Sequence, residues 1–269
     1  MEQFNTIPLT TLTGTFCACM GVEPPKYATT KIDELVEYIT SRCQNGKVDR
    51  VIIYNPDAIG DYIYRKYYDK FASVRKHLKK EQPMLSMIPP KTPVCFASIY
   101  SGATPEQHGI SKYVKPVLTI DTIFDALIRA GKKPCIVSVA GQSMDKIFRE
   151  RDMDYYSTVD DRSAVDKAIE LVKEDKYDFI CVYNQEHDSV MHITHPQSRS
   201  ALRALDHYCD NFDRLATAVK ENWKSHDTLV GFATDHGTHR EWYGLGQHGK
   251  NIPKDMNITH LYDIFPKQQ

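Results

Sequence analysis

Short apolar runs recur along the chain, and stretches with helical spacing separate them. Four runs rich in Val, Ile, Phe or Tyr are typical of buried strands: 51–54, 134–139, 177–183 and 228–234. Apolar residues repeat every three or four positions in further segments that predict amphipathic helices: 32–39, 121–131, 161–173 and 198–223. This alternation predicts an α/β fold with a mainly parallel central sheet and helices on both faces.

The remaining segments give weaker patterns. Residues 62–80 predict one helix, and residues 85–88 predict a short strand. Residues 1–28 show no clear periodicity and are expected to form an irregular lead or a short edge strand. The length of 269 residues is consistent with one α/β domain, in which residues 1–45 form an N-terminal extension with one helix.

Composition and charge narrow the classes of function. Hydrophobic residues make up 41% of the chain, which is enough for a sizeable core, and the net charge of -1 gives no general attraction for nucleic acid. No apolar stretch is long enough to cross a bilayer, and no secretory signal is visible at the N-terminus. The seven cysteines are odd in number and scattered, which favours reduced thiols. We therefore expect a cytoplasmic protein with neither a nucleic-acid nor a membrane partner.

Polar groups follow the predicted strands at the points where the strands end. Five sites carry them: Asp57, Thr92, Asp188 with His192, Asp235 with His236, and His248 on a later loop. Because parallel strands place their carboxyl ends at one edge of a sheet, these groups can converge there. Carboxylate and imidazole together suit zinc, manganese or iron. The sequence therefore predicts a metal site at this edge.

Each group also has an ordinary structural explanation. Asp57 and Asp235 would serve as helix or loop caps, and Thr92-Pro93 is typical of a helix start, with Thr92 at the N-cap. Asp188 and His192, however, stand four residues apart and share one face of a helical turn. Eight of the eleven histidines lie between residues 187 and 248. A plain packing domain has little reason to gather them, so the metal interpretation is favoured.

In this order and spacing the groups resemble the alkaline phosphatase superfamily, nearest to its nucleotide pyrophosphatase/phosphodiesterase and phosphonoacetate hydrolase branch. The resemblance covers about residues 51–260. It rests on motifs that stand in the sequence in this order: Asp57 after a strand, Thr92 ahead of Ser101-Gly102, Pro105-x-x-His108-Gly109-Ile110, Asp188-x-x-x-His192, Asp235-His236-Gly237 and His248-Gly249. It implies a three-layer α/β sandwich with two bound divalent metal ions, zinc first, with manganese or iron as alternatives.

The resemblance also implies a role for each group. One metal would take Asp188, His192 and His248, and the other would take Asp57, Thr92, Asp235 and His236. Thr92 would attack phosphorus and form a phosphothreonine, which water would then hydrolyse. A nucleophilic threonine next to a metal is chemically reasonable, because a threonine hydroxyl is a poor nucleophile at neutral pH until a divalent metal lowers its pKa.

One position departs from the family pattern. Relatives of this branch carry an Asn three residues after His-Gly-Ile, where this chain has Tyr113. A phenol can donate one hydrogen bond to a phosphoryl oxygen, so Tyr113 is a candidate phosphate-positioning group, and Lys91 and Asn55 are two more. The chain is also short for the superfamily, so insertions that shape a substrate pocket are small.

Three functional hypotheses follow. The first is a metal-dependent hydrolase of phosphate mono- or diesters, acting on a small molecule. The second is a hydrolase of the carbon–phosphorus bond of a phosphonate. The third is an inactive domain that binds metal and a nucleotide, which Tyr113 in place of Asn keeps open. A packing domain without any of these activities is the remaining alternative.

Overall fold

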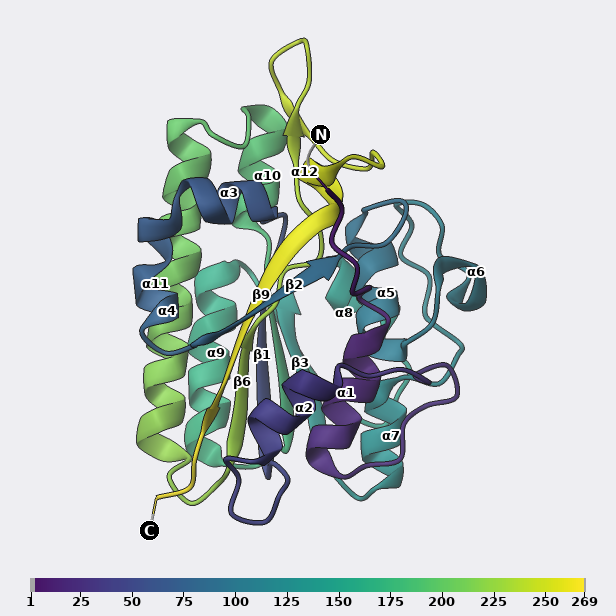
Figure 1. Ribbon diagram of the computed structural model, residues 1–269, viewed down its shortest axis with the longest axis vertical. Coiled ribbons are helices and arrows are strands. Elements are labelled where there is room, and N and C mark those ends of the chain that lie inside the picture. The colour runs from purple at the N-terminus through teal and green to yellow at the C-terminus, as the bar shows by residue number, and fades with distance from the viewer. Residues whose placement is uncertain (1–2, 269) are drawn as a thin grey trace.

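The computed structural model describes residues 3–268 and contains one large mixed sheet (Figure 1). The sheet has seven strands in the order β2-β9-β6-β1-β5-β3-β4. Their bounds are β1 Arg50–Pro56, β2 Lys80–Leu85, β3 Pro134–Val139, β4 Asp154–Thr158, β5 Phe179–Asn184, β6 Thr228–Phe232 and β9 Asn257–Phe265. The five strands from β6 to β4 are parallel, whereas β9 is antiparallel to both β6 and β2. The prediction of a mainly parallel sheet is confirmed.

Helices cover both faces of this sheet, as Figure 1 shows. One face packs against α1 Thr11–Met20, α2 Asp33–Thr40, α5 Thr92–Ser101, α7 Ile123–Arg129 and α8 Ser143–Ile147. The other packs against α3 Asp61–Lys66, the 3-10 turn η1 Tyr68–Phe71, α4 Ala72–Arg75, α9 Asp161–Glu174 and α11 Arg199–Asn222. The remaining elements are short: α6 Pro105–His108, α10 Glu186–Ile193, α12 Pro253–Met256 and the hairpin β7 His239–Arg240 with β8 Gly246–Gln247.

The alternation of side chains along β1 explains the two layers. Val51 and Ile53 belong to the hydrophobic cluster on one face, and Ile52 and Tyr54 belong to the cluster on the other. Successive residues of a strand point to opposite faces, so a continuous apolar run marks a strand that is buried on both sides. The same reason makes β5 and β3 fully buried along their whole length.

The N-terminal region differs from its prediction. Residues 11–20 form α1 rather than an irregular lead, so the described part of this extension, residues 3–45, contains two helices where one was expected. Nine of the ten residues of α1 are buried, including Thr13 and Thr15. A helix that is buried on nearly all sides shows no amphipathic period, so the pattern of residues 11–20 does not predict a helix. Phe16 of α1 packs edge-on against Phe179 of β5 and Tyr262 of β9.

The long helix predicted over residues 62–80 is also wrong. The helical path breaks at Tyr67, whose φ of -111° and ψ of 35° lie outside the helical region, and β2 already begins at Lys80. This strand was expected at residues 85–88, but it spans Lys80–Leu85. Its polar residues and Pro83 hide the strand pattern, and they are tolerated because β2 lies at the edge of the sheet.

Gly231 of β6 offers a test of this packing. A Cβ atom added there would lie 2.7 Å from the ring of Tyr262 and 2.9 Å from Ile53 Cδ1, both fully buried. Because the ring has no room to move, Gly231→Ala is expected to lower the free energy of unfolding by about 1–3 kcal/mol. Urea denaturation measures this, with exposed Val159→Ala as the control. Equal stability of both variants would contradict the packing described here.

Candidate metal centre

The three central parallel strands deliver the acidic residues to one edge of the sheet. Asp57 follows β1, Asp188 lies on α10 just after β5, and Asp235 with His236 follows β6. The strands are in direct register, since Pro56 pairs with Asn184 and Tyr54 pairs with Phe232. The carboxyl ends therefore meet at the same level, where ligands of open α/β sheets bind.

Two further segments complete the site from the sides. Thr92 is the first residue of α5, and Lys91 rather than Thr92 is its N-cap, one position earlier than expected. Lys91 Nζ donates to the carbonyl oxygen of His248 at 2.9 Å, and His248 Nδ1 lies 2.8 Å from the carbonyl oxygen of Pro90. These two bonds fix the His248 loop beside the start of α5.

The first group of ligands surrounds the Thr92 hydroxyl. Thr92 Oγ1 lies 3.4 Å from Asp57 Oδ2 and 3.3 Å from His236 Nε2. His236 Nε2 in turn lies 3.5 Å from Asp57 Oδ1 and 3.3 Å from Asp235 Oδ2. Thr92 is 2% exposed, and Asp57, Asp235 and His236 are at most 1% exposed. Four polar groups therefore face one small buried space.

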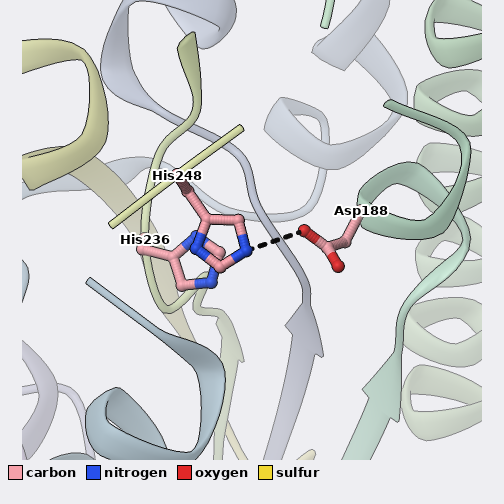
Figure 2. A group of neighbouring side chains, drawn as sticks. All are labelled: Asp188, His236 and His248. Carbon is pink, nitrogen blue, oxygen red and sulfur yellow. Dashed lines mark ion pairs between the residues drawn. The ribbon is translucent and has the colours of Figure 1, made fainter. Parts of the chain in front are cut away.

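The second group lies around Asp188. Its Oδ1 is 3.5 Å from His248 Nε2 and 3.4 Å from His192 Nε2. Figure 2 shows His248 and His236 side by side on one side and Asp188 reaching toward them from α10; the two imidazole rings stack with centroids 4.0 Å apart. Ligand atoms of Asp188, His236 and His248 all lie within 4.8 Å of one another, and the same holds for Asp57, Asp235 and His236. His236 thus borders both groups.

The carboxylate oxygens that face this space have no hydrogen-bond partner. Within residues 3–268, Asp57 Oδ1, Asp188 Oδ1 and Asp235 Oδ2 are buried and accept no hydrogen bond. His236 Nδ1 lies 3.1 Å from the carbonyl oxygen of Gly237. An Nδ1–H bond to that oxygen, like the one from His248 to Pro90, leaves Nε2 with a lone pair toward the carboxylates. Oxygen and imidazole donors of this kind fit divalent metal ions.

The pKa shifts of the three carboxylates also favour a bound cation. Burial raises the pKa of Asp57 well above its usual range, and the charges of Asp235 and Asp188 raise it further. Burial also raises the pKa of Asp235. For Asp188, burial acts upward too, but contact with His192 and the charges of His248 and His192 bring the pKa down to about 2. Three anions this close are unfavourable without positive charge between them.

Comparison with known proteins identifies the family of this chain. The sequence profile described as type I phosphodiesterase / nucleotide pyrophosphatase matches residues 57–242, more than half of the chain. The chain belongs to this family. That span contains Asp57, Thr92, Asp188, Asp235 and His236. No curated protein matches the chain.

Solved structures of the wider superfamily share the fold. Human ectonucleotide pyrophosphatase/phosphodiesterase 5 superposes with a TM-score of 0.56 at 16% identity, covering 71% of this chain and 57% of that one. An inactive threonine-to-alanine variant of the murine protein, in complex with AMP, gives 0.57 at 17% identity, covering 71% and 58%. Phosphonoacetate hydrolase from Sinorhizobium meliloti 1021, bound to phosphonoformate, gives 0.51 at 18% identity, covering 70% and 56%. The chain thus spans less than three fifths of the length of these family and superfamily structures.

The three candidate phosphate-positioning groups lie in different surroundings. Tyr113 is 55% exposed, yet partial burial and then the charges of Asp57, Asp188 and Asp235 raise the pKa of its phenol, so this side chain lies in the field of the three carboxylates. Lys91 is occupied with the carbonyl oxygen of His248. Asn55 is fully buried; its amide donates to the carbonyl oxygen of Ala233, and its side-chain oxygen accepts from Tyr100. Asn55 therefore braces the strand ends, and Tyr113 is the candidate that remains.

Two residues that the sequence did not single out support the ligands. The Tyr183 phenol donates to Asp57 Oδ2, which leaves Oδ1 of that carboxylate free. Fully buried Asp255 holds the loop between His236 and His248: its carbonyl accepts from Gly237 N at 2.8 Å, and Oδ2 accepts from Lys250 N at 2.9 Å. Tyr183 gave no sequence signal beyond its strand, and Asp255 stands next to Pro253-Lys254, an ordinary helix start.

Steric contacts explain why the residue after Asp235-His236 is a glycine. A Cβ atom at Gly237 would lie 2.0 Å from the carbonyl oxygen of Lys254 and 2.8 Å from the Cα atom of Gly60. The backbone of the loop can approach α12 only without a side chain at this position. The same approach allows the bond from Gly237 N to the carbonyl oxygen of Asp255, so the position of the loop after His236 depends on it.

Asp255→Asn tests whether this clamp positions the metal ligands. The neutral side chain holds Lys250 N and His239 less well, so we expect zinc affinity to fall about 10–100-fold, as for other groups that orient ligands. Isothermal titration of metal-free protein measures the affinity. Asp227→Asn is the matched control, because Asp227 is equally buried and accepts from Gln44 N and Lys267 N away from the site. If both variants lose affinity equally, the clamp has no specific role.

Proposed function

We propose that this chain is a metal-dependent phosphoester hydrolase with Thr92 as its nucleophile. The observation that carries the proposal is the position of Thr92 Oγ1, 3.4 Å from Asp57 Oδ2 and 3.3 Å from His236 Nε2, at a cluster in which Asp57 Oδ1 and Asp235 Oδ2 have no hydrogen-bond partner. Membership of the phosphodiesterase family supports it. So does the murine relative, in which a threonine-to-alanine change accompanies inactivity and AMP is bound.

The family resemblance divides the residues into two metal sites, and the distances are compatible with that division. Asp57, Asp235 and His236 would hold one ion with Thr92 Oγ1, since His236 Nε2 lies within 3.5 Å of both carboxylates. The other ion would take Asp188, His192 and His248, since both imidazoles approach Asp188 Oδ1 within 3.5 Å. Zinc suits these donors best, with manganese or iron as alternatives. Bound dications lower the pKa of a hydroxyl and neutralise phosphoryl oxygens.

The chain's own groups then account for the reaction. Thr92 begins α5, so a phosphoryl group beside it meets the positive end of a ten-residue helix. The Thr92 hydroxyl gives up its proton and Oγ1 forms a bond to phosphorus, while the bond from phosphorus to the leaving ester oxygen breaks and that oxygen takes up a proton; the product is a phosphothreonine. Water then adds to phosphorus as the Thr92–phosphorus bond breaks, which restores the Thr92 hydroxyl and releases phosphate from a monoester or a phosphate monoester from a diester. Burial of Thr92 keeps bulk water from competing with the substrate in the first step.

Three finer assignments belong to the same proposal. Residues 3–268 act as one domain, because α1 and α2 share a hydrophobic cluster with the central strands. The substrate is a small phosphoester. A cytoplasmic location fits the seven cysteines, which are all buried free thiols. Within residues 3–268 no helix is both long and apolar enough to cross a membrane.

Thr92→Ala tests the nucleophile. We expect hydrolysis of bis-nitrophenyl phosphate and nitrophenyl phosphate to fall by about 10³-fold or more, because the step that forms the covalent intermediate is lost. The two metal sites keep their carboxylates and imidazoles, so metal analysis should still find bound zinc. Thr13→Ala, which removes another buried hydroxyl that donates to the Ile99 carbonyl, should keep its activity. Unchanged turnover by Thr92→Ala would remove this residue from the mechanism.

A panel of phosphate monoesters, phosphate diesters and phosphonates distinguishes the phosphoester hydrolase from the two alternative functions. Phosphonoacetate is included because the superposed Sinorhizobium structures hold phosphonoacetate or phosphonoformate. Release of phosphate from phosphonates but not from esters would assign carbon–phosphorus cleavage instead. Full metal occupancy without turnover on any member of the panel would indicate a binding domain.

Tyr113→Phe tests the group that replaces the family's Asn. If the phenol donates to a phosphoryl oxygen in the transition state, kcat/KM falls about 5–20-fold, the worth of one such hydrogen bond. Metal affinity should not change, since Tyr113 is no ligand in either proposed site. Tyr243→Phe, at another exposed phenol, is the control. Equal kcat/KM in all three proteins would leave Tyr113 without a role in catalysis.

A further inference from the structure

The hairpin between the two metal-binding histidines carries an exposed aromatic tip. Trp242 is 91% exposed, Tyr243 is 50% exposed and Leu245 is 39% exposed, all within four consecutive residues. We call residues 240–245 the hairpin tip. Figure 1 shows this yellow-green hairpin projecting from the body of the molecule at the top of the view. A Trp side chain left almost wholly in water loses the free energy that burial would supply, so it indicates a binding function.

The base of the hairpin, by contrast, is firmly attached. Gly246 N donates to the carbonyl oxygen of Thr194 at 3.0 Å, and a Cβ atom at Gly246 would meet Met191 at 2.5 Å, so β8 lies directly against the end of α10. His239 bridges Asp255 Oδ1 at 2.8 Å and Glu241 Oε1 at 3.0 Å. The tip is therefore presented on a fixed base rather than on a loose loop.

Basic and apolar side chains lie in and beside the tip. Arg240 is exposed and donates from Nε to the carbonyl oxygen of Gly244, Lys250 pairs with Glu241, and Lys254 is exposed a few residues further along the chain. Glu241 is the one acidic residue in the described stretch 239–254. Ile193, at the end of α10, is 76% exposed. The combination is an aromatic and aliphatic tip with a net positive collar.

We propose that the hairpin tip docks on an anionic lipid surface, with Trp242 and Tyr243 at the level of the headgroups. Trp and Tyr place an apolar ring and a polar group at such an interface, and neighbouring Arg and Lys side chains are attracted to anionic lipid. A stable protein interface needs roughly 800 Å² from each partner, which a projecting tip of six residues does not offer. Insertion into a lipid surface suits a small convex tip.

The position of the tip links docking to the metal centre. It lies midway along the segment that runs from His236 to His248, and its base rests on α10, which carries Asp188 and His192. Docking there holds the metal centre close to the surface. No membrane partner was expected from the sequence, because no segment is long and apolar enough to cross a bilayer. A protein can bind to the surface of a bilayer without such a segment.

Tryptophan fluorescence gives a direct measurement. The chain has two Trp residues, and Trp223 is buried with its indole bonded to the Val172 carbonyl, so a change in emission reports on Trp242. The probes are vesicles of phosphatidylcholine alone or mixed with phosphatidylglycerol. We expect a blue shift and co-sedimentation with the anionic vesicles, both weakened by added salt. Docking needs no turnover, so a failure here leaves the hydrolase proposal untouched.

Matched variants separate the tip from the rest of the surface. Trp242→Ala should weaken co-sedimentation about tenfold or more, because its burial in lipid is lost, and Lys254→Gln should reduce the preference for anionic vesicles. Val159→Ser removes an apolar side chain that is 85% exposed just after the edge strand β4, outside the hairpin tip, and it should bind like the parent. Each variant changes an exposed side chain, and thermal melting checks that each is folded.

Two outcomes would overturn the proposal. One is unchanged emission without co-sedimentation on every vesicle. The other is a blue shift that depends on protein concentration in the absence of lipid and is lost with Trp242→Ala, which would assign the tip to contact between copies of the chain.

Discussion

Two buried carboxylates, and a partly buried third that shares the His236 imidazole with them, set the main electrostatic constraint in this structure. Asp57 and Asp235 are almost inaccessible to solvent, and Asp188 faces them from α10. Two like charges roughly 4 Å apart repel by about 4 kcal/mol at an effective dielectric constant near 20, a substantial part of the stability of an ordinary domain. Their free oxygens and the inward Nε2 atoms of His236 and His248 together form a site that bound cations would stabilise.

The scaffold holds these groups against their own repulsion. The strands β5, β1 and β6 are adjacent, parallel and buried on both faces, so the residues at their carboxyl ends cannot move apart without disrupting the core. Tyr183 holds one oxygen of Asp57, and the Ala58 backbone donates to Asp235 Oδ1 at 3.2 Å. Asp255 and Lys91 fix the loop that carries His248. Oxygen and imidazole groups held rigidly in this way suit a divalent metal ion.

The segment from His236 to His248 has a buried base and an exposed tip. At the base, His236 and His248 stack beside Asp188, as Figure 2 shows. At the hairpin tip, Trp242 is exposed to solvent. A network of His239, Glu241, Lys250 and Asp255 lies between them and is almost fully hydrogen-bonded. Because the network joins the base to the tip, the segment positions the candidate metal ligands His236 and His248 and also presents the exposed Trp242.

The sequence by itself determined the α/β class, the central strands and the family, because apolar strands buried on both faces leave a continuous pattern and because Asp235-His236-Gly237 stands directly after one of them. It also named the residues that meet at the sheet edge. It did not reveal α1, whose burial on nearly all sides removes any period, nor β2, whose edge position admits Pro83 and charged residues. The tertiary structure alone decided that His236 borders both ligand groups, that Asn55 serves the strands, and that Tyr183 and Asp255 support the site, because those contacts join residues distant in sequence.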